Sequence, residues 1–375
     1  MKIIYILSLL IFCINNQSHS IHTLLSQKSN LNYSTKLGYF RDLMNDEIIS
    51  YYNSSSYHKG LKKEDLLNFL QNIISNNQKK IEYKEAWDSK WQYFTLLDRD
   101  WENDPLTQEE IEETTPEKFG WKTKNVLCLP LYTDKLIFNG SPTLVDREHV
   151  WPSSKGFKFK YNLYENQNYQ PFAATDMHNL HMADRKNNQN GHNNLPFGNI
   201  LDKSSAKEIP SSTTGEITGY VGINKYGIKV YEPRDVDKGD IARTLFYMAT
   251  RYHNFRSIDN YDPALILKTN FDDNSEADRT FTVNKTHFEP AAYGILEDLL
   301  EWNKLDPVDN HEIHRNNLCY NIVQGNRNPY IDFPEWADFA FGNSDVGIDL
   351  ESPNGLEKIE NSDNFGNKEE NMIPI

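Results

Sequence analysis

DREHVWPSS, residues 146–154, together with TDMHNL, residues 175–180, decides the fold and the chemistry that we expect of this chain. The first stretch contains Glu148 and His149, and the second contains Asn179, thirty positions after His149. Magnesium is a hard cation that takes carboxylate and amide oxygens as ligands and has little preference for imidazole. Glu148 and Asn179 are therefore predicted to hold one metal ion, and His149 is predicted to act as a base beside it.

A proline in the first stretch sets the local backbone. Pro152 keeps Trp151 out of helical geometry, because the proline ring clashes with the residue before it. Residues 142–150 are therefore predicted to be extended, with His149 near the end of a strand.

The second stretch has the signal of a helix start. Thr175 or Asp176 can cap a helix over residues 177–184, which would place Asn179 in the first turn. A strand end that faces a helix start would hold two ligands around one ion. Taken alone, such an asparagine is more often a capping residue and a Glu-His pair is more often a surface pair, so only their combination favours a site.

The composition is that of a globular protein with one continuous domain. The chain has 375 residues, of which 38% are apolar, 25% charged and 13% aromatic, enough for a sizeable core. Apolar positions recur at helical spacing in some segments and alternate in short runs elsewhere. The expected fold class is α+β, with mixed helices and short antiparallel strands. The predicted helices cover 66–74, 83–97, 237–252 and 289–303, and the predicted strands cover 126–132, 135–138 and a hairpin over 216–231.

Residues 1–20 are typical of a secretory signal peptide. Lys2 precedes an apolar stretch over 3–14, and Ser18 and Ser20 occupy the small-residue positions of a cleavage site. The apolar stretch is short for a bilayer span, so we expect a secreted protein without stable membrane association. Sequons for N-glycosylation lie at Asn32, Asn53, Asn139 and Asn284.

The net charge of −15 disfavours a polyanionic partner, because lysine and arginine contacts to phosphates supply most non-specific affinity. The acids are concentrated, however: residues 102–117 hold seven acids and no base, and residues 342–375 hold eight acids and two lysines. We predict an acidic surface insertion near 101–122 and a disordered acidic tail over 343–375. The rest of the single catalytic domain, 21–342, is close to neutral, so nucleic acid is not excluded.

Cysteine usage leaves two interpretations open. Cys13 would leave with the signal peptide, so that Cys128 and Cys319 remain. In an oxidising compartment this pair can close one disulfide. Two buried, unpaired thiols fit the sequence equally well.

Five blocks of sequence occur in a fixed order: REHVWPSS, DMHNL, the LPFG that follows Asn194, GDIARTLFYMATRY, and LLEWNKLDPVDNHEIHRNNLCYNIVQGNRNPYIDFPEW. Together they resemble the secreted endonuclease I family of ββα-metal, or His-Me finger, nucleases. The resemblance spans about Tyr51 to Phe341, with a break at the acidic insertion. It implies a ββα-metal motif and a magnesium-dependent endonuclease that cuts DNA and RNA with little sequence preference. Mn²⁺ and Ca²⁺ accept the same oxygen ligands.

The resemblance assigns roles to the three residues named first. It implies that His149 is the general base, Glu148 the carboxylate ligand and Asn179 the amide ligand. An imidazole with a pKa of about 6.5 can take a proton from water in line with the phosphorus at neutral pH. The metal would neutralise charge on the pentacovalent phosphate and, through one of its waters, protonate the departing 3′ oxygen, which leaves 5′-phosphate ends. A carbonyl or amide oxygen must hold the other ring nitrogen of His149.

The chain departs from the family pattern at the contact to the phosphate. No arginine lies between Val150 and Asn179, where some family members have one. Arg147 fits either a phosphate contact or a structural salt bridge, and His192 fits either a phosphate contact or a plain loop residue. The other candidates for the phosphate contact are Lys155, Lys158, Lys160 and Arg185.

Two other functions fit part of the pattern. A nucleic-acid-binding protein on a decayed nuclease scaffold would tolerate the loss of Glu148, His149 or Asn179, and all three are present. A phosphomonoesterase would use the same base and ion on small substrates, and it predicts a closed pocket rather than an open groove with spread lysines. We expect a monomer whose substrates are DNA and RNA.

Overall fold

A computed structural model describes the following residues: 46–54, 56–57, 59–76, 78–81, 91–104, 125–157, 171–254, 264–268 and 291–350. The predicted signal peptide, most of the predicted acidic insertion and the part of the predicted tail beyond residue 350 lie outside them. No helix within these ranges is long and apolar enough to cross a membrane.

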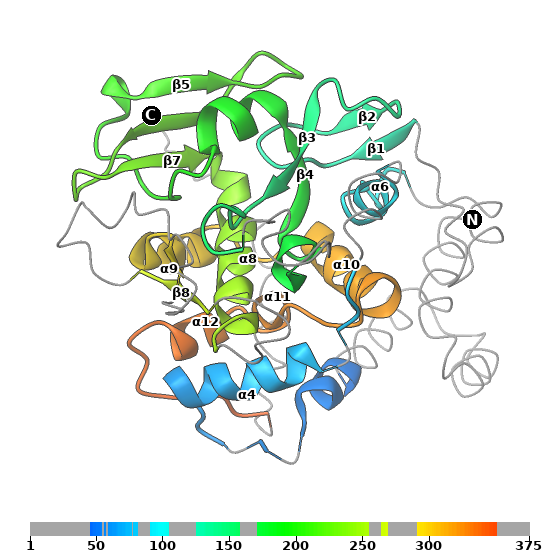
Figure 1. Cartoon of the computed structure of the whole chain (residues 1–375), viewed down its shortest axis with the longest axis vertical. Coiled ribbons are helices and arrows are strands. Elements are labelled where there is room, and N and C mark those ends of the chain that lie inside the picture. Colours follow the sequence, from blue (N-terminus) through cyan, green and yellow to red (C-terminus); the bar gives the residue numbers. More distant parts are fainter. Residues whose placement is uncertain are drawn as a thin grey trace, which may run out of the picture.

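Helix α8 (Lys238–Arg251) runs through the middle of the molecule, and other elements pack around it (Figure 1). The predicted apolar face with Ile241, Leu245 and Met248 is confirmed, but every residue of the helix except Asp240 is buried. A helix enclosed on all sides is the centre of a core rather than a surface layer. The elements that contact it include α4 (Lys63–Ser75), α9 (Leu296–Leu305), α11 (Pro329–Asp332) and strand β8 (Leu265–Leu267).

The other predicted helices are present with shifted ends. The helix predicted over 66–74 is α4. The helix predicted over 289–303 begins later, as α9, because Ala291–Tyr293 forms strand β9. Of the helix predicted over 83–97, the described part contains α6 (Gln92–Leu97). The described part also contains α10 (Asn310–Leu318) and α12 (Trp336–Ala340).

The strands form small sheets, most of them near the end of α8 at which that helix begins (Figure 1). The antiparallel pairs are β1 (Val126–Cys128) with β2 (Leu136–Phe138), β3 (Val145–His149) with β4 (Leu180–Asp184), and β6 (Ile217–Ile223) with both β5 (Lys207–Pro210) and β7 (Lys229–Pro233). The hairpin predicted over 216–231 is confirmed as β6 and β7. Strands β8 and β9 pair in parallel, unlike the antiparallel pairing expected. The α+β class of mixed helices and short strands is confirmed.

The helix predicted over 177–184 is wrong, because Leu180–Asp184 forms strand β4. This strand pairs with β3 so that His149 lies opposite Leu180. All five residues of β4 are buried, and a short buried run has no periodicity that separates a strand from a helix. The chain becomes helical only after β4, at residues 185–192.

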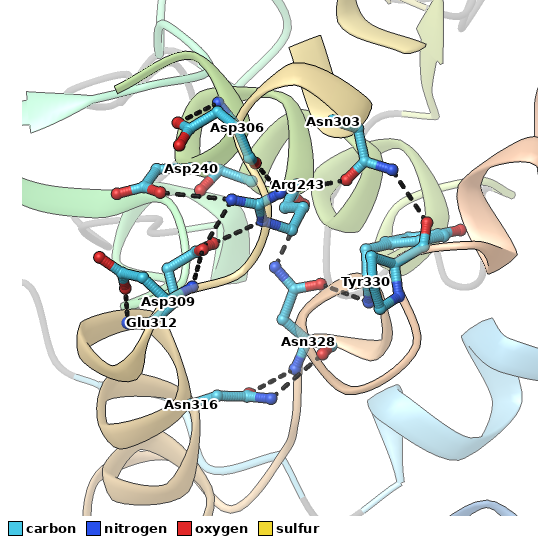
Figure 2. A network of polar contacts seen from close by, with 12 residues as sticks. Asp240, Arg243, Asn303, Asp306, Asp309, Glu312, Asn316, Asn328 and Tyr330 are labelled. Carbon is cyan, nitrogen blue, oxygen red and sulfur yellow. Dashed lines mark hydrogen bonds and ion pairs between the residues drawn. The ribbon is translucent and has the colours of Figure 1, made fainter. Parts of the chain in front are cut away.

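A buried ion-pair network joins α8 to the segments around α10 and α11, as Figure 2 shows. The guanidinium of Arg243 contacts both carboxylate oxygens of Glu312 at 2.6 Å and the carbonyl oxygen of Asp306 at 2.8 Å. The carbonyl of Arg243 accepts a hydrogen bond from Asn328 at 3.1 Å. Arg243 is fully buried, and a buried charge is tolerated only when it is partnered in this way.

Residues 343–350, named the C-terminal strap here, belong to the folded body, so the predicted tail boundary at residue 343 is wrong. Ile348 is fully buried. Its N–H donates to the carbonyl of Leu61 at 3.0 Å, and its own carbonyl accepts from Gly60 at 2.9 Å. The acidic composition of residues 343–375 predicts disorder. Composition alone does not indicate that a single apolar side chain, that of Ile348, is buried in the core.

Cys128 and Cys319 are buried, unpaired thiols, which is the second of the two interpretations that the sequence leaves open. Both side chains pack into one apolar cluster with residues of α6, β1 and β4. Burial raises the pKa of Cys319 to about 12. A thiol held neutral in an apolar cluster behaves as a small hydrophobic group.

Candidate active site

His149 is the last residue of β3, as predicted, and its ring is held by the backbone. Nε2 lies 2.9 Å from the carbonyl oxygen of Ala174, at the end of the 3₁₀ turn Phe172–Ala174. Because a carbonyl oxygen only accepts, Nε2 carries the hydrogen and Nδ1 carries the lone pair. The ring also packs against Phe157, with centroids 6.0 Å apart. Ala174 therefore supplies the acceptor that the sequence requires but does not identify.

The environment of His149 favours its neutral form. Burial lowers the pKa below the ordinary value of 6.5, while the hydrogen bond to Ala174 and the charge of Glu148 oppose this shift in part. Desolvation disfavours the imidazolium ion. The ring is therefore neutral at pH 7, as a general base must be.

Glu148 precedes His149 in the strand, so its side chain leaves the opposite face. The carboxylate is buried, and Oε1 accepts hydrogen bonds from the hydroxyl of Tyr132 at 2.9 Å and from Nδ1 of His192 at 2.5 Å. No donor among the described residues reaches the other oxygen, Oε2. Tyr132 and His192 thus orient the carboxylate through Oε1. The other oxygen, Oε2, is of the type that hard metal ions take as a ligand.

His192 has a role that the sequence did not reveal. It is 1% exposed and ends the short helix Asn187–His192, where its ring stacks on Phe197 with centroids 4.2 Å apart. Its Nε2 lies 2.6 Å from the hydroxyl of Tyr293, while Nδ1 holds Glu148. Both earlier expectations, a loop residue and a phosphate contact, are wrong because the side chain is buried against the carboxylate.

Asn179 is fully buried and clamps the loop that follows His149. Its Oδ1 accepts from the N–H of Trp151 at 2.7 Å, and its Nδ2 donates to the carbonyl of Trp151 at 3.1 Å. The backbone carbonyl of Asn179 accepts from Val150 at 3.1 Å. The structure therefore shows this side chain bonded to the loop backbone, and no hydrogen bond within the described ranges joins it to Glu148.

Asp176 anchors the segment that carries the carbonyl of Ala174. Its Oδ2 accepts from the hydroxyls of Tyr247 and Tyr252 in and beside α8, at 2.8 and 2.9 Å. The predicted role as a helix cap is wrong, because no helix follows it and its side chain is buried against α8. The hydrogen bonds of Asp176 thus attach to α8 the segment whose Ala174 carbonyl accepts from His149.

The cations proposed as phosphate contacts divide into three groups. Arg147 places its guanidinium 4.5 Å from the ring centroid of Trp91, and Arg185 lies 3.2 Å from Asp146. These two arginines are engaged locally, Arg147 by this cation–π contact and Arg185 by the carboxylate of Asp146. Lys155 lies in the turn after β3 and lines a cavity. Lys158 and Lys160 lie outside the described residues.

The amino-acid sequence matches the family model described as Endonuclease I over residues 63–335. The chain belongs to the endonuclease I family. It is similar to the extracellular ribonuclease of Bacillus amyloliquefaciens, with 32% identity over 290 residues that make up 77% of each chain. A second relative is the extracellular ribonuclease of Bacillus subtilis (strain 168), 37% identical over 194 residues and 52% of each chain.

A third relative is the Endonuclease-1 of Buchnera aphidicola subsp. Baizongia pistaciae (strain Bp), 28% identical over 197 residues. That match covers 50% of this chain and 61% of the relative. The chain thus spans about half of the Bacillus subtilis protein and under two thirds of the Buchnera protein. The endonuclease I match includes the whole of the site described above and ends before the C-terminal strap.

Within this endonuclease I chain, Asn188 is a second amide that sequence reasoning missed. It lies four residues before His192 in the same short helix, so both side chains leave the helix on the same side. His192 contacts Glu148, which places Asn188 one turn along from that contact. The side chain of Asn188 is half-buried and has no hydrogen bond to any residue that the structure describes. We did not predict a role for Asn188 because the helix was predicted over 177–184, whereas the chain is helical at 185–192.

Proposed function

We propose that the chain is a secreted endonuclease that hydrolyses phosphodiester bonds in DNA and RNA with the help of Mg²⁺, leaving 5′-phosphate ends. The fixed ring of His149 carries the proposal, because the hydrogen bond to Ala174 and the lowered pKa leave Nδ1 as a base at neutral pH. The names of the relatives support it, since two are extracellular ribonucleases and one is an Endonuclease-1.

In the proposed reaction His149 takes a proton from the attacking water at Nδ1. The carbonyl of Ala174 then stabilises the imidazolium ion through Nε2–H, and keeps the ring from turning away from the water. The anchoring of Asp176 to α8 holds that carbonyl in place.

Glu148 would hold the Mg²⁺ ion through its unbonded oxygen, with an amide oxygen as a second ligand. Asn179 is the amide that the resemblance implies, and Asn188 is the one whose side chain has no hydrogen bond within the described ranges. Bound there, the cation supplies positive charge as the phosphate becomes pentacovalent. The order β3, β4 and a short helix supports assignment of a ββα-metal motif.

Cleavage of plasmid DNA and of a structured RNA by the full chain tests the proposal. We expect both to be cut with Mg²⁺ present, and neither to be cut with EDTA or by His149→Ala. His253→Ala is a matched control, because His253 lies just beyond the end of α8 and its ring pairs with Glu64 at 2.8 Å. Full activity of His149→Ala, or cleavage in EDTA, would contradict the proposed chemistry.

A further inference from the structure

A cavity of about 400 Å³ lies beside the proposed active site. Its walls are the turn after β3, the end of the helix Asn187–His192 and the sheet formed by β5, β6 and β7. No carboxylate is among the residues that line it. Its polar lining consists mainly of Lys155, Lys207, Lys229, Asn190, Asn193 and Asn194.

The three lysines of this cavity differ from other lysines of the molecule. Lys225 lies 2.7 Å from a carboxylate of Glu297, and Lys203 lies 2.9 Å from Glu232. Within the described ranges, the lysines of the cavity have no such ion pair; Lys207 reaches only the carbonyl of Asn190, at 3.5 Å. Like charges that converge without a counter-charge repel one another unless an anion binds between them. In a chain of net charge −15, this is a local concentration of positive charge.

The cavity shares two walls with the proposed active site. The carbonyl of Lys155 accepts from the indole nitrogen of Trp151 at 2.8 Å, so the first wall is tied to the loop that follows His149. The second wall belongs to the short helix that ends in His192. The hydroxyl of Ser154 donates to Asn194 at 2.7 Å and joins the two walls. The cavity and the proposed active site are therefore built on the same loop and the same short helix.

We infer that this cavity is a subsite that binds the nucleotide neighbouring the cleaved bond on one nucleic-acid strand, with the flanking phosphate on the lysines. This inference rests on the proposed function. The volume is within the range of small-molecule sites. Lysine contacts to phosphate give affinity without sequence preference, and the asparagine amides can donate to and accept from a sugar or a base edge.

Binding of a single strand to a variant that does not cleave it tests the subsite. The probe is a fluorescent single-stranded oligonucleotide of about 12 nucleotides. Its dissociation constant is measured by anisotropy for His149→Ala, alone and combined with Lys207→Gln and Lys229→Gln, from about 50 to about 200 mM salt. We expect the added substitutions to weaken binding roughly 10-fold or more at low salt, and to flatten the slope of log Kd against log salt by about 0.7, the value for one lost phosphate contact on a single strand.

Two control combinations separate local contacts from overall charge. Lys63→Gln with Lys304→Gln removes the same charge from exposed lysines on α4 and α9, and we expect binding and salt slope to stay as in His149→Ala. Lys207→Arg with Lys229→Arg keeps the charge and should retain most of the affinity. Equal weakening by the cavity and control pairs, or an unchanged slope for the cavity pair, would overturn the subsite.

Failure of the subsite is distinct from failure of the proposed function. One outcome is that wild-type protein cuts nucleic acid, His149→Ala does not, and substitution of the cavity lysines leaves the affinity for the oligonucleotide unchanged. In that case the nuclease assignment is supported and the subsite is contradicted. If His149→Ala still cuts the probe, the assignment of the base falls, and this is seen directly as shortening of the oligonucleotide.

Discussion

At the scale of single residues, the reactivity of His149 depends on one carbonyl group and on burial. The Ala174 carbonyl fixes the hydrogen on Nε2, and burial keeps the ring neutral. Neither effect needs a charged partner for the ring, unlike a histidine held by a carboxylate. The pKa of the ring should therefore lie below its ordinary value of 6.5, so that the base is neutral at pH 7.

The first prediction concerns the pH dependence of cleavage. The pKa of His149 is shifted below 6.5, and only the neutral ring accepts a proton, so we expect kcat/KM to be level near pH 7 and to fall in a limb centred below pH 6.5. The measurement is kcat/KM on an oligonucleotide from about pH 4.5 to about pH 8 with saturating Mg²⁺. A limb centred above pH 7 would show that the ring is not held in its neutral form.

The second prediction distinguishes the two amides that could serve as the second metal ligand. Asn188→Ala removes a half-buried side chain without a hydrogen bond to the described residues, so we expect an unchanged Tm, a raised Mg²⁺ requirement and a loss of activity of about 10- to 100-fold. Asn179→Ala breaks two hydrogen bonds to Trp151 and should lower stability by roughly 1–3 kcal/mol. Thermal unfolding and Mg²⁺ titrations of activity measure both effects. An Asn188→Ala enzyme with a normal Mg²⁺ requirement would return the role to Asn179.

Local sequence correctly predicted a strand end at His149 but could not predict the residues that support Glu148 and His149. The strand end at His149 follows from Pro152, two residues past Val150, which is a local effect. The donors to Glu148 come from Tyr132 and His192, 16 residues before it and 44 residues after it. Such contacts depend on the tertiary fold, and no spacing rule within one chain predicts them.

At the scale of elements, the β3–β4 pair is the main departure from the predictions. Residues 177–184 include apolar side chains and follow a cap-like aspartate, Asp176, and both features favour a helix locally. Pairing with β3 and burial of all five residues of β4 outweigh this preference, as tertiary context often does. Elements with a clear period over three or more turns, such as α4 and α8, were predicted well because their signal is local and long.

The third prediction concerns the network that holds α8 to α10. Arg243→Met leaves the carboxylate of Glu312 buried without its guanidinium partner, so we expect a loss of about 3–5 kcal/mol in the free energy of unfolding. Urea unfolding followed by circular dichroism measures it. Lys63→Met, on the exposed side of α4, is the control and should change stability by less than about 0.5 kcal/mol. A loss for Arg243→Met as small as that of the control would show that the network contributes little.

At the scale of the whole molecule, the C-terminal strap closes the fold over the segment before α4. The fourth prediction is that truncation after Gly342 lowers the free energy of unfolding by about 2 kcal/mol or more, since it exposes the site of the buried Ile348 and removes its two backbone hydrogen bonds. Truncation after Leu350 keeps these contacts and is the matched control. Equal unfolding midpoints for the two truncated chains would contradict a structural role for the strap.

The two unpaired cysteines determine how the stability of the protein depends on the redox potential of the solution. With both sulfurs uncoupled and packed among apolar neighbours, the native state is independent of the redox potential. Dithiothreitol should leave the Tm unchanged, and denatured chains should refold without an oxidant or a disulfide isomerase. A protein of this kind reaches its working form by packing alone, in a reducing solution as readily as in an oxidising one.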